Sequence, residues 1–479
     1  MSIQKAKAGL CLLYEKWFSE YCDDPNNSEK GQELKALILK DSAAVVGELE
    51  KHFELVYAGP MASVDDAPKS ISLFREKDVD LIIVVSLFWS GDKPLLKVLE
   101  ALPHVPLLLW CYAPTVTLPA HMGMNDLFRA GGVVGAMQTS APLRKLNKKF
   151  SFVYGTPGDP SLDLELKEYG RAFAARRAMK GLRLGHYFGR YEEMTGTYAD
   201  EFFLLGKFGI DLVPISAYRV YQEANALSES RVREYLHALK GRCSSVNVSE
   251  EALTHAARAS LAIGVVAEQE GLGAIALEDF NSEMHSLLKT RPQLWIPTFD
   301  EMRLVPSMEG DVLASLALWV SIQLGETLPM YTEMFAFDQV RNSVLMGHAS
   351  MNCLELAGNN PISIIPDAEC GALDACEGAW LHFKGRDGAV TVASLFDTGG
   401  GHYRTAVFEG TASYSDLLDT SPNVLVKLPI PLKDFYKKML TAGMTQHFSL
   451  SYDATASVWE KFCEVAQIDF LKIDGQASM

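Results

Sequence analysis

The feature that most constrains the fold is a pair of uninterrupted apolar runs separated by a helical segment. The first run, Leu81 to Leu87, is followed by a helical pattern from Pro94 to Leu102 and by a second run, Pro106 to Tyr112. Strands that are apolar on both faces are typical of parallel sheets covered by helices on each side. The first third of the chain is therefore expected to form an open parallel α/β sheet.

The ends of these strands are the places where a ligand is expected. Ligands of open parallel sheets bind outside the carboxyl ends of the strands. In this sequence we expect those ends to carry Trp89–Ser90, Tyr112–Ala113 and, later, Gln138–Ser140.

The remaining sequence divides into two further patterns. A second alternation of strands and helices begins at Arg183, and short strands with Gly, Asp and Pro between them take over after about Pro366. Such a run of short strands indicates an antiparallel β region. The predicted fold class is α/β, with two open parallel-sheet α/β domains followed by a mainly antiparallel, β-barrel-like domain; the expected domains are residues 1–180, 181–365 and 366–479.

Composition indicates which binding partners and which cellular compartment to expect. The 479 residues carry a formal net charge of −16, which disfavours nucleic acid and anionic membranes as partners. No apolar run approaches the roughly 20 residues that span a bilayer, and the N-terminus has no signal-peptide pattern. The eight cysteines form no C-x-x-C pair, so we expect free thiols and a cytoplasmic protein.

Three residues in the second half stand out as candidate metal ligands. Glu309 lies in the segment SMEG, at the start of a helix expected to begin near Met308, whereas Glu333 and His348 are embedded in apolar sequence. Each alone reads as an ordinary surface or structural residue. Together they would be costly to bury unless paired or bound to a cation. Oxygen ligands with some imidazole favour Mn²⁺, Co²⁺ or Mg²⁺ over a thiolate zinc site.

Four segments resemble a known family. The sequences SMEGD (307–311), MYTEMF (330–335), MGHAS (346–350) and TQHFSLSYD (445–453) are similar, in order and approximate spacing, to the metal-ligand segments of the L-arabinose isomerase and L-fucose isomerase group. The segments 80–112 and 383–395 also resemble parts of that family. The resemblance implies that Glu309, Glu333, His348 and His447 bind a divalent metal, most simply Mn²⁺, with Co²⁺ or Mg²⁺ as alternatives.

The resemblance also implies a reaction and an assembly. The expected activity is metal-dependent aldose–ketose isomerisation through an enediol(ate), with Glu309 and Glu333 as acid/base groups; a hydride shift stays open. A homo-oligomer, trimer or hexamer, is expected, in which the N-terminal domain of one subunit completes its neighbour's site. We expect Gln138, from the family pattern, and Trp89, from its strand end, to contact the sugar.

Departures from the family pattern leave the sugar open. Ala141 stands where L-arabinose isomerases have a His, and Asp338 could serve as the Asp ligand that L-fucose isomerases use. The alternatives are an isomerase of an L-fucose-like or modified, charged hexose, a non-catalytic sugar-binding protein and, more remotely, a metal-dependent hydrolase.

Overall fold

The computed structural model describes residues 5–370 and 377–475, and the chain divides into two compact units. Unit 1 comprises residues 1–177 and unit 2 residues 178–479, so the boundary falls inside helix α7 (Pro160–Met179). The parallel sheets of the N-terminal part and the mostly antiparallel sheet of the C-terminal region confirm the predicted α/β class. The division of unit 2 into a central and a C-terminal domain stays a prediction.

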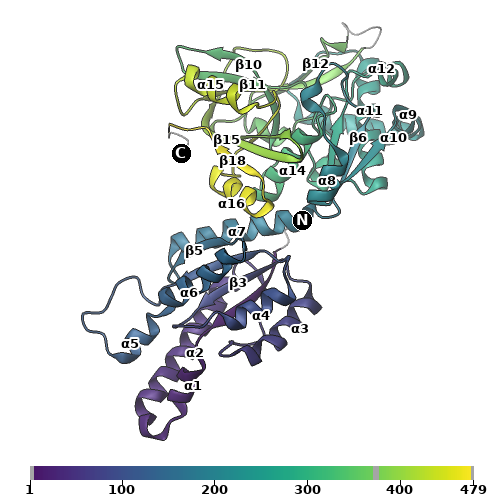
Figure 1. Cartoon of the computed structure of the whole chain (residues 1–479). Coiled ribbons are helices and arrows are strands. Elements are labelled where there is room, and N and C mark those ends of the chain that lie inside the picture. Colours follow the sequence, from purple (N-terminus) through teal and green to yellow (C-terminus); the bar gives the residue numbers. More distant parts are fainter. Residues whose placement is uncertain (1–4, 371–376, 476–479) are drawn as a thin grey trace. The chain divides into compact units, whose positions relative to one another are not determined.

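Unit 1 is built on a five-stranded sheet with the order β2-β1-β3-β4-β5, in which every pair is parallel. Its strands β3 and β4 are the two apolar runs, and they are buried almost throughout. Figure 1 shows helices α3 and α4 lying together beside this sheet. The strands are β1 (Lys7–Leu13), β2 (Glu54–Val56), β3 (Leu81–Ser86), β4 (Leu107–Tyr112) and β5 (Ser151–Gly155); the α-helices before α7 are α1 (Lys16–Asp23), α2 (Ser28–Glu50), α3 (Ala67–Lys77), α4 (Lys93–Ala101), α5 (Met124–Arg129) and α6 (Gly132–Lys145).

One expected strand end in unit 1 is wrong. Gln138 to Ser140 lie inside helix α6, not after a strand. The helix packs on β3 and β4 through small residues, and an added Cβ at Gly135 would lie 2.7 Å from the Ser86 Cβ. The glycine-rich start of α6 does not predict a helix from the sequence, because Gly is a weak helix former unless packing favours it.

Unit 2 begins with a second parallel sheet of order β7-β6-β9. A parallel bridge between Ala276 and Ser307 adds a fourth segment beside β9. The polar segments that follow these strands therefore meet at one edge of the sheet. The strands are β6 (Arg183–Tyr187), β7 (Asp211–Ile215) and β9 (Ala274–Leu277), and the surrounding helices are α8 (Glu201–Phe208), α9 (Ala217–Ala226), α10 (Glu229–Arg242), α11 (Glu250–Glu270), α12 (Ser282–Leu288), α13 (Pro297–Met302) and α14 (Val312–Leu324).

The rest of unit 2 is mostly antiparallel. A small sheet of order β13-β12-β8 is accompanied by a seven-stranded sheet of order β14-β17-β10-β11-β16-β15-β18, in which β14 also pairs with β15. The remaining elements are β8 (Ser245–Val246), β10 (Met330–Asp338), β11 (Ser343–Gly347), β12 (Ile362–Pro366), β13 (Ala379–Phe383), β14 (Gly388–Gly399), β15 (His402–Ser413), β16 (Asn423–Lys427), β17 (Phe448–Ser451), β18 (Asp469–Lys472), α15 (Leu432–Ala442) and α16 (Ala456–Ala466).

The antiparallel region starts earlier than the sequence suggested. Strands β10 and β11, which precede Pro366, form a hairpin within the seven-stranded sheet. Their apolar residues do not alternate cleanly with polar ones, because β11 is buried on both faces. The predicted start of the antiparallel region, near Pro366, is therefore wrong: the region begins one hairpin earlier in the chain.

Two expectations drawn from composition meet the structure here. No helix in the described parts of the chain combines the length and hydropathy needed to cross a membrane. Six cysteines are free thiols, as expected, but Cys370 is not free, and Cys376 lies outside the described residues.

Candidate metal centre

Glu309 lies at the edge of the parallel sheet in unit 2, just before helix α14. Its backbone adopts φ +60°, and that of Gly310 φ +66°, so neither residue continues a helix. Helix α14 begins at Val312, capped by the Asp311 carboxylate, which accepts a hydrogen bond from the Ala314 N–H. The expectation that Glu309 occupies the first helical turn is therefore wrong. The left-handed turn carries Glu309 ahead of the helix instead.

His348 follows directly on strand β11 and is buried. The backbone approaches closely here, since an added Cβ at Gly347 would lie 2.3 Å from the Pro422 carbonyl oxygen. The His348 Nδ1–H donates to the Ala349 carbonyl over 3.0 Å. This hydrogen bond fixes the tautomer that leaves Nε2 as a lone-pair donor.

His447 precedes strand β17 and is also buried. Its Nδ1–H donates to the Asp311 carboxylate over 2.8 Å. A carboxylate on the far ring nitrogen orients an imidazole and strengthens Nε2 as a metal ligand. Asp311 thus both caps α14 and positions His447.

The three side chains converge on one point. The His348 Nε2 lies 3.5 Å from Glu309 Oε1, and the His447 Nε2 lies 3.0 Å from Glu309 Oε2. One ligand atom from each of the three residues falls within 4.8 Å of the others. Yet Glu309 Oε2 and both Nε2 atoms are buried and have no hydrogen-bond partner of good geometry. Buried polar atoms left in this state fit a divalent cation, which one carboxylate and two neutral imidazoles would hold.

The electrostatics of the three groups are strongly coupled. Burial raises the pKa of the Glu309 carboxyl, but His348 and His447 outweigh it, and the net pKa is lowered. Burial lowers the pKa of His447, but the raising effect of Asp311 and Glu309 is larger, and the resulting pKa is about 10. The pKa of His348 is likewise raised by Glu309 against the effect of burial. Without a metal, the imidazoles therefore hold protons that a cation has to displace.

A tyrosine ring packs against both imidazoles. Tyr331 on β10 is buried, and its ring centroid lies 4.7 Å from that of His348 and 5.2 Å from that of His447. Its hydroxyl donates to the Met308 carbonyl over 3.3 Å. The ring therefore restricts the rotamers of both histidines.

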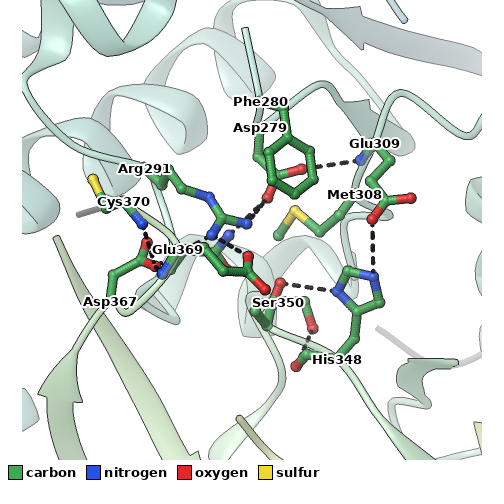
Figure 2. Close-up of polar contacts among 12 residues, drawn as sticks. Asp279, Phe280, Arg291, Met308, Glu309, His348, Ser350, Asp367, Glu369 and Cys370 are labelled. Carbon is green, nitrogen blue, oxygen red and sulfur yellow. Dashed lines mark hydrogen bonds and ion pairs between the residues drawn. The ribbon is translucent and has the colours of Figure 1, made fainter. Parts of the chain in front are cut away.

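A buried ionic network lies beside Glu309 (Figure 2). Asp279, which follows β9, accepts the Glu309 N–H through Oδ1 over 3.1 Å and pairs through Oδ2 with the Arg291 guanidinium. Arg291 is fully buried and also pairs with Asp367 and Glu369. The network thus fixes the backbone of Glu309 in its left-handed conformation.

The fourth expected ligand, Glu333, lies close to the three but is not part of their group. It sits on β10 with Gly347 as its cross-strand partner, half-buried, and its charge contributes to raising the pKa of His348. Asp338, at the other end of β10, forms an ion pair with Arg341 over 2.8 Å. Among the described residues, neither acid belongs to the cluster of Glu309, His348 and His447.

The two expected sugar contacts belong to unit 1. Trp89 follows β3 and is half-buried, whereas Gln138 is exposed on α6. Their role in binding a sugar stays a prediction.

Sequence reasoning missed Asp279, Arg291, Asp311 and Tyr331. Two of these carried a usable signal. Asp279 follows an apolar parallel strand, the same place that drew attention to Trp89, and Asp311 stands in an N-cap position after Gly310. Arg291 and Tyr331 carried none, because their partners are distant in sequence.

Comparison with known proteins agrees with the geometry. Residues 327–469 match the family model of the L-arabinose isomerase C-terminal domain. The chain is 24% identical to the sulfoquinovose isomerase of Priestia megaterium over 410 residues, covering 82% of this chain and 85% of that protein. It is 22% identical to the sulfoquinovose isomerase of Alkalicoccus urumqiensis, covering 74% and 78%.

A more distant relative is the L-arabinose isomerase of Bacteroides thetaiotaomicron, 26% identical over 294 residues, covering 56% of this chain and 55% of that protein. The matched relatives are thus named for two different sugars, sulfoquinovose and L-arabinose. These matches confirm the resemblance predicted from the sequence: the chain is similar to sulfoquinovose isomerases and L-arabinose isomerases.

Proposed function

We propose that this protein is a metal-dependent aldose–ketose isomerase whose cation is held by Glu309, His348 and His447, with Glu333 as the fourth ligand. The observation that carries the proposal is the convergence of three buried, unsatisfied ligand atoms at the edge of a parallel sheet. The relatives, all named as sugar isomerases, support the reaction class.

The ligand set has the chemistry that isomerisation needs. When bound, a divalent cation such as Mn²⁺ would supply Lewis-acid polarisation of the sugar carbonyl. The Ala349 carbonyl and the Asp311 carboxylate accept the Nδ1–H groups of the two histidines, so each imidazole would bind the cation through Nε2 once the proton there is displaced. Glu309 and Glu333 are the carboxylates available to take a proton from one sugar carbon and return it to the next. Burial of Glu309 excludes competing water.

Several finer features belong to the same proposal. The pairing of β14 with β15 supports a barrel-like closure of the C-terminal sheet. A cytoplasmic homo-oligomer in which Trp89 and Gln138 complete a neighbouring site is consistent with the family, as is a substrate that bears a charge, since the first relatives act on sulfoquinovose, a sulfonated hexose.

Metal removal and one substitution test this proposal. Protein treated with a chelator should lose isomerase activity on a panel of neutral and sulfonated aldoses and regain it with Mn²⁺. Glu333→Gln should lower kcat by about 10²- to 10⁴-fold, the usual worth of a general acid–base group, while the circular dichroism spectrum stays unchanged. Glu251→Gln, a change at an exposed position on α11, serves as the control.

Three outcomes would contradict it. Full activity after chelation removes the metal from the reaction, and full activity of Glu333→Gln removes that carboxylate. Sugar binding without turnover, in protein that contains no metal after purification, would favour the alternative of a sugar-binding protein.

A further inference from the structure

The segment 188–198, between β6 and α8, borders the candidate metal centre on two sides. On one side it contacts the turn next to Glu309, since an added Cβ at Gly310 would lie 2.6 Å from the Gly189 carbonyl oxygen and 2.7 Å from the Arg190 Cα. On the other side it contacts the residue before His447, where the Gln446 side-chain amide lies 3.3 Å from the Met194 sulfur.

The same segment also reaches the ionic network. The ring of Tyr191 lies 5.4 Å from that of Phe280, the residue after Asp279. Three separate contacts therefore hold segment 188–198 against residues adjacent to Glu309, His447 and Asp279. It forms one wall of the site.

Arg190 is the cation of this wall. It is exposed, and among the described residues no carboxylate lies within 4.0 Å of its guanidinium, although Glu192 and Glu193 are neighbours in sequence. Its charge acts on His186, a β6 side chain whose pKa is lowered by burial and by Arg190 and whose buried Nε2 has no hydrogen-bond partner.

The guanidinium is held in place without a counter-ion. Its Cζ lies 3.4 Å from the centroid of the Tyr198 ring, and the Tyr198 hydroxyl donates to the Glu192 carbonyl over 2.8 Å. Stacking on a fixed aromatic ring reduces the rotamer entropy lost when the guanidinium binds an anion. The planar fork of donors remains free to meet an oxyanion in bidentate geometry.

We infer that Arg190 recognises the anionic group of a charged sugar and sets the specificity of this enzyme for acidic hexoses, above all a sulfonated one. The inference rests on the proposed isomerase function. C6 of a hexose lies four bonds beyond C2 and its substituent five, or roughly 7 Å along the chain at about 1.5 Å per bond, and an arginine side chain spans a similar length. A hexose with its C1–C2 end at Glu309 is thus long enough for its far end to meet Arg190.

The test compares sulfoquinovose with glucose, its neutral parent. We expect the wild-type protein to isomerise sulfoquinovose with the higher kcat/KM. Arg190→Leu should lower that value roughly 10- to 100-fold, the worth of a hydrogen bond to a charged group, mainly through KM, and leave glucose unchanged. Arg190→Lys should recover part of the loss, and added salt should weaken sulfoquinovose binding in the wild type more than in Arg190→Leu. The matched control is Arg233→Leu, at an exposed arginine of α10.

The outcomes separate the two proposals. No turnover of any sugar, with Mn²⁺ present, overturns the isomerase function and this inference with it. Turnover of both sugars with equal reduction by Arg190→Leu, or with no reduction, overturns the role of Arg190 alone. A loss confined to sulfoquinovose supports it, because a merely structural defect would affect both sugars.

Discussion

Each unit contains an arginine buried against carboxylates, and the two arrangements differ in charge balance. In unit 1, Arg129 forms a two-pronged contact with Asp41, at 2.6 and 2.8 Å, and its side chain keeps 17% of its surface exposed. In unit 2, Arg291 is fully buried and pairs with the buried Asp279 and Asp367 and with the exposed Glu369, so that the four groups carry a net formal charge of −2. The first is an ion pair without net charge that links two parts of unit 1. The second is an acidic cluster that touches Glu309, and negative charge beside a site favours a cation there.

The largest expected effect comes from removing the two arginines in turn. Arg291→Met should lower the free energy of unfolding by about 3–5 kcal/mol, because it leaves buried carboxylates without a counter-charge. Arg129→Met should cost less, about 1–3 kcal/mol, since water reaches the partly exposed pair. Urea titration of chelator-treated protein measures both.

Metal affinity sharpens the same comparison. Because Asp279 holds the Glu309 backbone, Arg291→Met should also weaken Mn²⁺ binding, measured by calorimetry under native conditions, whereas Arg129→Met should not. Equal losses of stability with unchanged metal binding in both variants would show that the two arrangements are equivalent structural ties.

A second contrast concerns two buried glutamates. Glu48 in unit 1 is matched by two donors, the Lys51 ammonium at 2.8 Å and the Gly158 N–H at 2.9 Å. Among the described residues, Glu278 in unit 2 accepts a hydrogen bond from the Phe280 N–H alone, at 2.7 Å, and its Oε2 is buried without a partner. Burial, reinforced by Asp279, raises the pKa of Glu278 from its usual 4.5 to about 8.

This contrast predicts that replacement by Gln changes the stability of the folded protein in opposite directions at the two positions. A carboxyl whose pKa is raised in the folded state contributes stability below pH 4.5 that is lost as the pH rises to about 8. Wild-type protein should lose a few kcal/mol over that range from this group, at about 1.4 kcal/mol per pKa unit. Glu278→Gln should remove this loss and unfold at a higher temperature than wild type at pH 8.5. Glu48→Gln, which gives up a charged partner, should be less stable there.

Calorimetry at pH 5 and pH 8.5, with a chelator present, distinguishes the cases. If Glu278→Gln and wild type show the same dependence on pH, Glu278 is ionised in the folded protein, and the excess of buried negative charge is larger than the comparison assumes.

The sequence indicated the fold better than the assembly of the site. The strand from Leu81 could be predicted because its pattern is local, a continuous apolar run. The ligands Glu309, His348 and His447 were selected by family resemblance. Their convergence depends on how the chain brings together segments 39 to 138 residues apart, which no local pattern encodes.

Local geometry at the site was equally hidden. A glutamate rarely adopts positive φ, so nothing in SMEG predicted the left-handed turn at Glu309. That conformation persists because the Asp279 carboxylate accepts its N–H and because Gly310 continues the turn. Arg291, which supports Asp279, draws its other partners from residues 76 and 78 positions away. Such long-range compensation is visible only once the chain has folded.

The smallest expected effect separates two helix caps that share one local role. Asp311 caps α14 and also accepts the His447 Nδ1–H, whereas Asp200 caps α8 by accepting the Phe203 N–H and has no histidine partner among the described residues. Asn is as good an N-cap as Asp, so both Asp→Asn variants should remain folded.

Only Asp311→Asn should affect the metal. Replacing the carboxylate by a neutral amide weakens the orientation and basicity of His447. Loss of such a hydrogen-bond partner of a ligand histidine typically reduces metal affinity about 10- to 100-fold, or about 1.4–2.7 kcal/mol. Mn²⁺ titration of Asp311→Asn and Asp200→Asn, followed by thermal unfolding of the metal-free forms, measures this difference. Equal affinities in the two variants would show that Asp311 acts as a helix cap and does not support the metal ligand His447. Of the charged residues outside the ligand set, Asp279 and Arg291 alone would then be left to influence metal binding.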